Sequence, residues 1–349
     1  METVAEGHVL GVGNPLLDFL ANVDEQLFAK YNLKTDDAIL TDDKDNPLYK
    51  ELEDKYDVTY AAGGATLNTI KMIQWTLRKP QRCTYIGCIA SDYAGDLLKQ
   101  ECDKLGLRTR FEVTGSGSGT GRCAVLLLGK HRSMVTHLGA AKELSLGGLL
   151  DASIWSLVES AKVYYISGYV ISSCFEGIIE IAKHSRINGK LFCFNLSAPF
   201  ISTFLTEKLD AILPYVDILF GNKAEALAYG DSHGHFNEPL SKIAQRLCMI
   251  KSNSDRPVDR IVIITQDADQ VIVARTGEPE TKEFAVPHID DEYIVDTNGA
   301  GDAFAAGFIA EYIISGSVEK SIQSALKAAG YIIQRSGFTL GPRDKYDLD

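Results

Sequence analysis

The stretch DTNGAGD at residues 296–302 leads into an apolar segment whose three-and-four spacing predicts a helix over residues 302–315. Three small residues allow close backbone approach, and the N–H groups at a helix start point outward with the positive end of the helix dipole. The stretch therefore predicts an anion hole suited to a phosphoryl group. Asp302, at the mouth of this hole, is a candidate general base for attack on phosphorus, although an Asp at a helix start can also serve only as an N-cap.

Around this stretch, the second half of the chain alternates between apolar runs and helical patterns. Strands are expected at 162–167, 190–197, 217–221 and 260–265, and helices at 174–187, 204–213 and, after the predicted helix at 302–315, at 318–336. This alternation predicts an α/β fold with a mostly parallel sheet flanked by helices on both faces.

The first 140 residues depart from this alternation of strands and helices, because two insertions of different composition interrupt it. A helix is expected at 65–78, a strand at 83–90 and a helix at 94–105, while the insertions cover 19–62 and 109–140, the latter with strands at 122–128 and 132–138. Neither insertion could bury a core alone, so we expect the two to pair into one small sheet over a cleft. The predicted organisation is a large α/β domain of residues 1–18, 63–114 and 141–349 and a small β-rich lid of residues 19–62 and 115–140.

The composition limits the partners and the compartment. The 349 residues include 35 Lys and Arg and 47 Asp and Glu, which gives a net charge of −12. No polycationic surface that would bind nucleic acid or anionic membranes is therefore expected. No apolar run approaches the roughly 18 residues of a membrane span. Seven scattered cysteines without a C-x-x-C spacing argue against both a disulfide framework and a zinc knuckle. We therefore expect a cytoplasmic protein and leave the nucleus open as a second compartment.

The common nucleotide-binding motifs are absent from the sequence. No G-x-x-x-x-G-K-[ST] loop occurs, and the segment HRS at residues 131–133 lacks the catalytic Asp of a protein-kinase H-R-D loop. The segment GVGNPL at residues 11–16 has no third glycine, and Pro15 would disrupt the turn of a dinucleotide fingerprint. A Rossmann dehydrogenase is thus disfavoured.

Five motifs in sequence order resemble one known family. The segment DTNGAGDAFAAGFI at 296–309 resembles the carboxyl-terminal signature of the ribokinase-like (PfkB) carbohydrate kinases, and AGGATLN at 62–68 resembles their amino-terminal Gly-Gly motif. Three further segments extend the likeness over nearly the whole chain: GNPLLD at 13–18, NLSAPF at 195–200 and PYVDILFGNKAEA at 214–226. The resemblance implies a ribokinase-like fold. The resemblance is most specific to the family members that transfer the γ-phosphoryl group of ATP to the 5′-hydroxyl of adenosine, giving AMP and ADP in purine salvage.

The resemblance also assigns the catalytic and ATP-side residues. It implies that Asp302 is the base and that the amides from Gly299 through Ala300 and Gly301 to Asp302 form the anion hole, with Arg132 reaching the transferring phosphates from the lid. The ATP-binding residues that it implies are Asn195, Asn222, Thr265, Gly299 and Gly301. Asn222 and Glu225 would order Mg²⁺, mainly through water. Whether a monovalent cation also binds is left open.

The adenosine-binding residues are implied in the same way. They are Asn14, Leu16, Asp18, Ile39, Gly63, Gly64, Asn68, Cys123, Leu138, Phe200 and Asn298. Asp18, Gly64 and Asn68 would hold the ribose hydroxyls, and the apolar members would line the adenine ring. Cys123 and Leu138 could equally serve only as packing in the lid sheet.

Two departures from the family pattern bear on this assignment. Asp267 stands in the ATP-side loop where a glycine is usual, so its carboxylate either repels phosphate or points to solvent, and Ala65 replaces a commoner Ser. Two other functions stay open: another sugar or nucleoside kinase of this fold, and a nucleoside-binding regulator without phosphoryl transfer. The expected partners are adenosine and ATP, and we expect a monomer.

Overall fold

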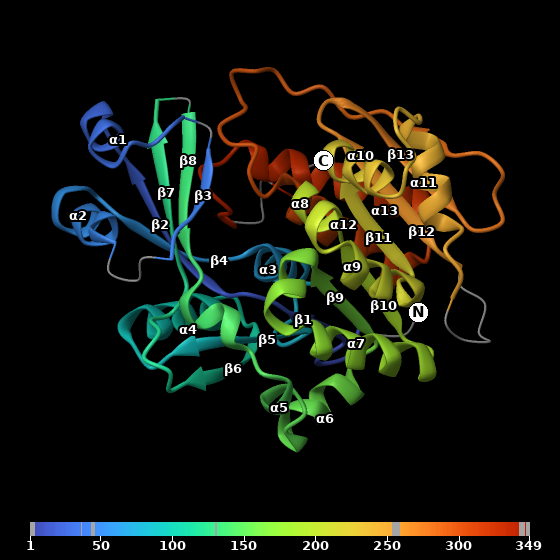
Figure 1. Ribbon diagram of the computed structural model, residues 1–349, viewed down its shortest axis with the longest axis horizontal. Coiled ribbons are helices and arrows are strands. Elements are labelled where there is room, and N and C mark those ends of the chain that lie inside the picture. The colour runs from blue at the N-terminus through green and yellow to red at the C-terminus, as the bar shows by residue number, and fades with distance from the viewer. Residues whose placement is uncertain are drawn as a thin grey trace.

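The computed structural model describes residues 4–35, 37–42, 46–129, 131–252, 259–341 and 346. Its larger sheet has nine strands (Figure 1). In spatial order they are β14 (Lys282–Phe284), β13 (Asp269–Arg275), β12 (Ile261–Gln266), β11 (Ile218–Asn222), β10 (Leu191–Asn195), β9 (Val163–Ser167), β1 (Val9–Val12), β5 (Cys83–Ala90) and β6 (Arg108–Thr114). The pairs from β12 to β6 are parallel, and β13 and β14 add antiparallel pairs at one edge.

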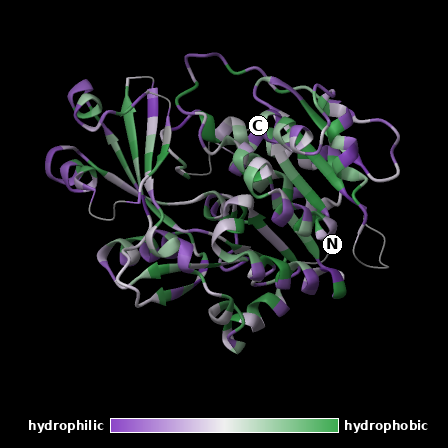
Figure 2. Ribbon diagram, viewed as in Figure 1, coloured by the Kyte–Doolittle hydropathy of each residue, from purple (hydrophilic) through white to green (hydrophobic). Residues whose placement is uncertain are grey.

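Helices cover both faces of this sheet, because successive residues of its buried strands point to opposite sides. On β9, Val163 and Tyr165 belong to one apolar core, and Tyr164 and Ile166 belong to the other. The first core includes α3 (Ala65–Thr76), α4 (Tyr93–Lys104), α12 (Ala300–Ser315) and α13 (Val318–Ile333). The second includes α6 (Ala152–Ser160), α7 (Ile171–Ile187), α9 (Thr206–Ile212), α10 (Lys223–Ser232) and α11 (Leu240–Cys248). Figure 2 shows the strands of the large sheet as hydrophobic and places hydrophilic residues on loops and helix surfaces.

A second sheet of five strands stands beside the first. Its order is β3 (Ala38–Leu40), β8 (His131–His137), β7 (Arg122–Leu128), β2 (Leu16–Asn22) and β4 (Thr59–Gly63). Both expected insertions contribute strands, but β6 of the second insertion lies in the large sheet, and β2 starts before the predicted boundary at residue 18. The helices α1 (Glu25–Tyr31) and α2 (Pro47–Lys55) lie on the side of the small sheet away from the large sheet (Figure 1).

The predicted α/β architecture is confirmed. The helix expected over 204–213 corresponds to α9. The helix α8 (Pro199–Phe204), which was not predicted, precedes it and is separated from it at Leu205, whose dihedrals of φ −121° and ψ 26° are not helical. The strands β13 and β14 and the helix α11 were not predicted. The remaining described elements are the short helix α5 (Leu146–Leu149) and three 3₁₀ segments, Gly139–Glu143, Gly168–Val170 and Leu213–Tyr215.

Two expectations from composition can be compared with the structure. All seven cysteines are buried free thiols, in agreement with the absence of a disulfide framework. In the described part of the chain, no helix has the length and apolar character that crossing a membrane requires.

Candidate active site

Several of the predicted site residues follow the carboxyl ends of parallel strands in the large sheet. Asn195 and Asn222 end β10 and β11, Thr265 lies near the end of β12, and Asn14 comes two residues after β1. In open α/β sheets this edge is where ligands bind, because loops and helix starts converge there. The topology thus gathers residues from Asn14 to Thr265, which are far apart in the sequence, at one edge.

The DTNGAGD stretch forms the start of α12. Gly299 is the N-cap with φ 77°, a left-handed conformation that disfavours other residues. A Cβ atom there would lie 2.6 Å from Cδ2 of Phe338, so the ring also requires a glycine at 299. The amide of Ala300 donates to the carbonyl of Thr297 at 3.2 Å. The amides of Gly301 and Asp302 lie in the first turn, where helix geometry supplies no carbonyl partner, so they suit an anion.

Asp302 is held by the helix that follows the Gly-Gly motif. Nδ2 of Asn68 donates to Oδ2 of Asp302 at 3.0 Å, and the Thr69 hydroxyl donates to the Asp302 backbone carbonyl at 3.1 Å. Burial raises the pKa of Asp302 to about 7, an effect that the Asn68 hydrogen bond opposes. A carboxyl that titrates near neutral pH is suited to accept a proton from a hydroxyl group.

Asn68 carries a second polar atom that is ready for a ligand. Its Oδ1 is buried and has no hydrogen-bond partner among the described residues. A buried amide oxygen without a donor costs free energy, and a substrate hydroxyl beside Asp302 would supply that donor. The geometry therefore favours a hydroxyl-bearing substrate at this position.

The Gly-Gly motif lets Asp18 approach the same region. A Cβ atom at Gly63 would lie 2.2 Å from Oδ2 of Asp18. Gly64 has φ 99°, and a Cβ atom there would lie 2.3 Å from the carbonyl oxygen of Asn14. Burial raises the pKa of Asp18 to about 6, while the positive charges of Lys71 and Arg132 lower it. The two glycines are thus required by close packing and by backbone conformation.

The predicted apolar residues divide between the small sheet and the large domain. Leu16 packs with Cys123 in a small cluster on one face of the small sheet, and Cys123 lies opposite Asp18 in the β2–β7 register. Ile39 is on the edge strand β3, and Leu138 precedes the 3₁₀ segment Gly139–Glu143. This face contacts the carboxyl-terminal segment, since a Cβ atom at Gly337 would lie 2.3 Å from Cδ2 of Leu20.

Phe200 lies on the large domain at the start of α8. Its side chain is 42% exposed, and its ring centroid lies 6.3 Å from that of Tyr169. Asn14 is close by, because its Nδ2 donates to the Tyr169 carbonyl at 3.4 Å. The sequence did not single out Tyr169. Together with Phe200 it forms an exposed aromatic pair on which a flat ring could stack.

All the predicted ATP-binding residues except Gly299 line a small cavity of about 50 Å³. Its lining residues are Asn195, Phe220, Gly221, Asn222, Glu225, Ile263, Thr265, Gly301 and Phe304. Asn222 and Glu225 form a capping box, with the Asn222 amide and Nδ2 donating to the Glu225 carboxylate at 2.9 and 2.8 Å. Burial raises the pKa of Glu225 to about 7. Among the described residues, no group of three His, Cys, Asp or Glu is arranged to hold a metal ion.

The backbone conformation of Asp267 explains why a glycine is usual at this position of the ATP-side loop. Its φ is 50°, in the left-handed region, and its side chain is exposed in the turn between β12 and β13. Of the two sequence-based alternatives, the structure matches the one in which the carboxylate points to solvent.

Arg132 and Asn298 meet at a residue that the sequence did not single out. Asp296 is buried, forms an ion pair with Arg132 of β8, and accepts hydrogen bonds from the amide and Nδ2 of Asn298 at 2.9 and 3.0 Å. Its Oδ2 also accepts from the Gly337 amide at 3.1 Å. One carboxylate therefore joins the small sheet, the anion-hole loop and the carboxyl-terminal segment.

Lys71 is another residue that sequence reasoning missed. It is 4% exposed on α3, three residues after Asn68. The available signal was a stripe of long polar side chains at every third position, 68, 71 and 74, on a helix whose other residues are apolar or threonine. Such a stripe on a buried helix marks polar groups that must find partners.

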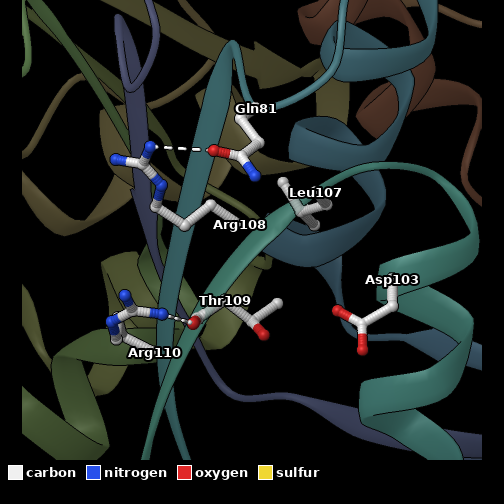
Figure 3. A pocket seen from close by; sticks show the side chains of 6 residues that line it. All are labelled: Gln81, Asp103, Leu107, Arg108, Thr109 and Arg110. Carbon is white, nitrogen blue, oxygen red and sulfur yellow. Dashed lines mark hydrogen bonds between the residues drawn. The ribbon is translucent and has the colours of Figure 1, made fainter.

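The larger of the two described cavities lies away from this site. It has a volume of about 570 Å³ beside the edge strand β6 and is lined by Gln81, Asp103, Leu107, Arg108, Thr109 and Arg110 (Figure 3). Arg108 donates to Gln81 at 3.0 Å, and Arg110 donates to the neighbouring Thr109 carbonyl at 2.8 Å. None of the predicted site residues lines it, so volume alone does not locate the chemistry.

Comparisons with known proteins agree with this geometry. The profile of the pfkB family carbohydrate kinases matches residues 26–345. Adenosine kinase 2 of Arabidopsis thaliana is 39% identical over 334 residues, which is 96% of each chain. The solved structure of the Schistosoma mansoni adenosine kinase with 2-fluoroadenosine superposes with a TM-score of 0.91 at 48% identity, covering 98% of this chain and 99% of the other. The Anopheles gambiae adenosine kinase, solved with P1,P4-di(adenosine-5) tetraphosphate, gives a TM-score of 0.87 at 37% identity and coverage of 97% and 99%.

The chain therefore belongs to the pfkB family of carbohydrate kinases and has the ribokinase-like fold. Within that family, it is similar to adenosine kinases over nearly its full length.

Proposed function

We propose that this protein is an adenosine kinase, which transfers the γ-phosphoryl group of ATP to the 5′-hydroxyl of adenosine and releases AMP and ADP. The observation that carries the proposal is the partly buried Asp302 carboxyl, which accepts a hydrogen bond from Asn68 beside the first-turn amides of α12. The adenosine kinases that this chain resembles make adenosine the substrate to test first.

In the proposed mechanism, Asp302 acts as the general base. Its ionised carboxylate accepts the proton of the 5′-hydroxyl as that oxygen attacks the γ-phosphorus, and the bond from the γ-phosphorus to the oxygen of the ADP leaving group breaks. The amides of Gly301 and Asp302 and the positive end of α12 stabilise charge on the transferring group.

The remaining predicted residues bind the two substrates. Asp18, Gly64 and Asn68 are proposed to hold the ribose hydroxyls, since a carboxylate and an amide oxygen accept hydrogen bonds from a vicinal diol. Leu16, Ile39, Cys123, Leu138 and Phe200 are proposed to enclose the adenine, with Asn14, Gly63 and Asn298 shaping that pocket. Asn195, Asn222 and Thr265 are proposed to lie along ATP.

Two further groups belong to this proposal. Mg²⁺ would be held through water by Asn222 and Glu225, and when bound it neutralises charge on the ATP phosphates. Arg132 would exchange Asp296 for the phosphates when the small sheet closes as a lid over the site. We further propose that the enzyme acts as a monomer in the cytoplasm.

An ATP-consumption assay with Mg²⁺ tests the function. The panel is adenosine, guanosine, inosine, ribose and fructose, with Asp302→Asn measured beside the wild type and Asp96→Asn as control, since Asp96 occupies the first turn of α4 on the surface. We expect adenosine turnover that Asp302→Asn lowers by about 10²–10⁴-fold and Asp96→Asn leaves unchanged. Turnover of a sugar alone would refute the adenine pocket, and adenosine binding without turnover would favour a regulatory protein.

A further inference from the structure

The buried ammonium group of Lys71 lies beside the active-site backbone. Its Nζ donates to the carbonyl of Ala62, the residue just before Gly63 and Gly64, and lies 5.3 Å from the ring centroid of Phe338. The same ring lies against Gly299 at the start of α12. Burial lowers the pKa of Lys71, and the negative charges around it, led by Asp18, oppose this effect and favour the positively charged form.

The charges that act on Lys71 include the two carboxylates of the site. In the β2–β4 register, Ala62 pairs with Leu17, which directly precedes Asp18, and the carboxylate of Asp18 lies against Gly63. Asn68 stands three residues before Lys71 on the same helix and donates to Asp302. The ammonium group thus acts on both carboxylates, one on β2 and one on α12.

The charged and titratable groups around Lys71 come from three elements. They are Asp18 of β2, Glu101 and Cys102 of α4 and Asp302 of α12, and Asp18 has the largest of these effects. The groups acting on Asp302 include Asn68, Lys71, Glu225 and Asp18, and its charge acts in turn on Tyr165 and Tyr169. Glu225 and Asp18 raise the pKa of Asp302, whereas Asn68 and Lys71 lower it. Lys71 therefore offsets the negative charges that oppose ionisation of Asp302.

We propose that Lys71 is a positioning residue whose positive charge keeps Asp302 ionised and ready to accept the substrate proton. The inference rests on the proposed function, because it assigns Asp302 the role of base. The Ala62 hydrogen bond is the structural part of the role of Lys71, and a neutral donor could supply it. The charge is the functional part, because it favours the ionised form of both carboxylates.

Three variants separate these two parts. Lys71→Met removes both the charge and the donor, and Lys71→Arg retains both. Gln74→Met is the matched control, because Gln74 lies one turn further along α3, is 2% exposed and makes only neutral hydrogen bonds, to the Lys79 carbonyl and the Cys83 amide. Should Lys71→Met fail to fold, Lys71→Gln takes its place, since it keeps a donor without the charge.

The first readout is independent of turnover. Carboxyl ¹³C NMR of aspartate-labelled protein follows Asp302 against pH, with its signal assigned by its loss in Asp302→Asn. We expect Lys71→Met to raise the Asp302 titration midpoint by at least about one pH unit, with Lys71→Arg close to the wild type and Gln74→Met unshifted. An unchanged midpoint in Lys71→Met, or an equal shift in Gln74→Met, would overturn the inference.

The second readout is the pH dependence of kcat for adenosine. For Lys71→Met, we expect kcat to fall about tenfold at pH 6.5 and to recover towards the wild-type value at pH 9. A loss equal at both pH values would assign Lys71 a purely structural role. If the wild type phosphorylates none of the panel, the proposed function fails, whereas the NMR midpoint still decides whether Lys71 governs Asp302.

Discussion

The Nδ2 atom of Asn68 on α3 donates a hydrogen bond of 3.0 Å to Oδ2 of Asp302 on α12. The two residues are 234 positions apart, and the contact joins the two motifs that carry the family resemblance. Because the bond favours the ionised carboxylate, Asn68 acts on the candidate base as well as on the region where a substrate hydroxyl would bind.

Replacement of Asn68 by Ala tests this double role. We expect the acidic limb of the kcat profile to move to higher pH, because Asp302 loses the hydrogen bond that lowers its pKa, and KM for adenosine to rise about tenfold, because a substrate hydroxyl loses its acceptor. Steady-state kinetics from pH 5.5 to 9 measure both effects. The control is Asn188→Ala at the exposed end of α7, which should alter neither parameter. A normal profile in Asn68→Ala would rule out the coupling.

The wild-type pH dependence follows from the direction of the Asp302 shift. Because burial raises its pKa to about 7 and the ionised form accepts the proton, kcat should fall about tenfold per pH unit below that value and level off above it. A kcat profile for adenosine at saturating ATP and Mg²⁺ measures the apparent pKa. An acidic limb near pH 4 in the wild-type profile would be inconsistent with a base of raised pKa. If the limb near pH 7 persists in the residual activity of Asp302→Asn, the titrating group is not Asp302.

The same shift predicts how the base affects stability. The folded-state pKa of about 7 lies above the ordinary 3.8, so the contribution of Asp302 to stability is fully present below about pH 4 and is lost as pH rises through 7. Asp302→Asn, which does not titrate, should therefore gain stability relative to the wild type between pH 5 and pH 8, by about 1–3 kcal/mol. Urea unfolding at the two pH values measures the difference. A constant difference would contradict the raised pKa.

The two ends of α12 provide a matched test of the anion hole. Gly299 and Gly316 cap the helix with φ 77° and 65°, but only at Gly299 does a Cβ atom meet another residue, Phe338. Gly316→Ala should cost about 1 kcal/mol of stability with kcat unchanged. Gly299→Ala should cost more and should also lower kcat, since the amides beside it must move. Thermal unfolding and steady-state assays test both variants, and equal kinetics would exclude a role for Gly299 in the hole.

The ion pair between Arg132 and Asp296 should be energetically coupled, because the Asp296 side chain is buried and the Arg132 side chain is only 11% exposed. Either single replacement, Asp296→Asn or Arg132→Met, leaves a buried charge without its partner and should cost about 3–5 kcal/mol. The double variant should lose less than the sum of the two, by about 1–3 kcal/mol. The exposed pair Arg246 and Glu238 is the control, with a coupling below about 1 kcal/mol. Additive losses at 132 and 296 would show that the pair does not join the small sheet to the anion-hole loop.

Local pattern was sufficient to predict the fold class and the start of the site. The alternation of apolar runs with helical spacing gave the parallel sheet, and the small residues before Asp302 gave a helix start with open amides. Both depend on interactions within a few residues, such as strand pleating and helix capping. The pattern failed where the local signal is weak, as in the short helix α8, which ends at Phe204, the first residue of the expected helix, and was not predicted.

The sequence by itself thus determined the sheet, the anion-hole helix and, through resemblance, the candidate residues. Only the tertiary structure decided which of them touch: Asn68 with Asp302, Arg132 with Asp296, and Phe338 over both Gly299 and Lys71. Burial is the physical reason, because a carboxyl or ammonium group has its ordinary pKa in water and acquires a new one only when distant segments exclude water and fix its neighbours. No spacing along the chain states that the charge of Lys71 acts on two carboxylates. The packing of α3 against α12 and the hydrogen bond from Lys71 to Ala62 of the small sheet bring this about.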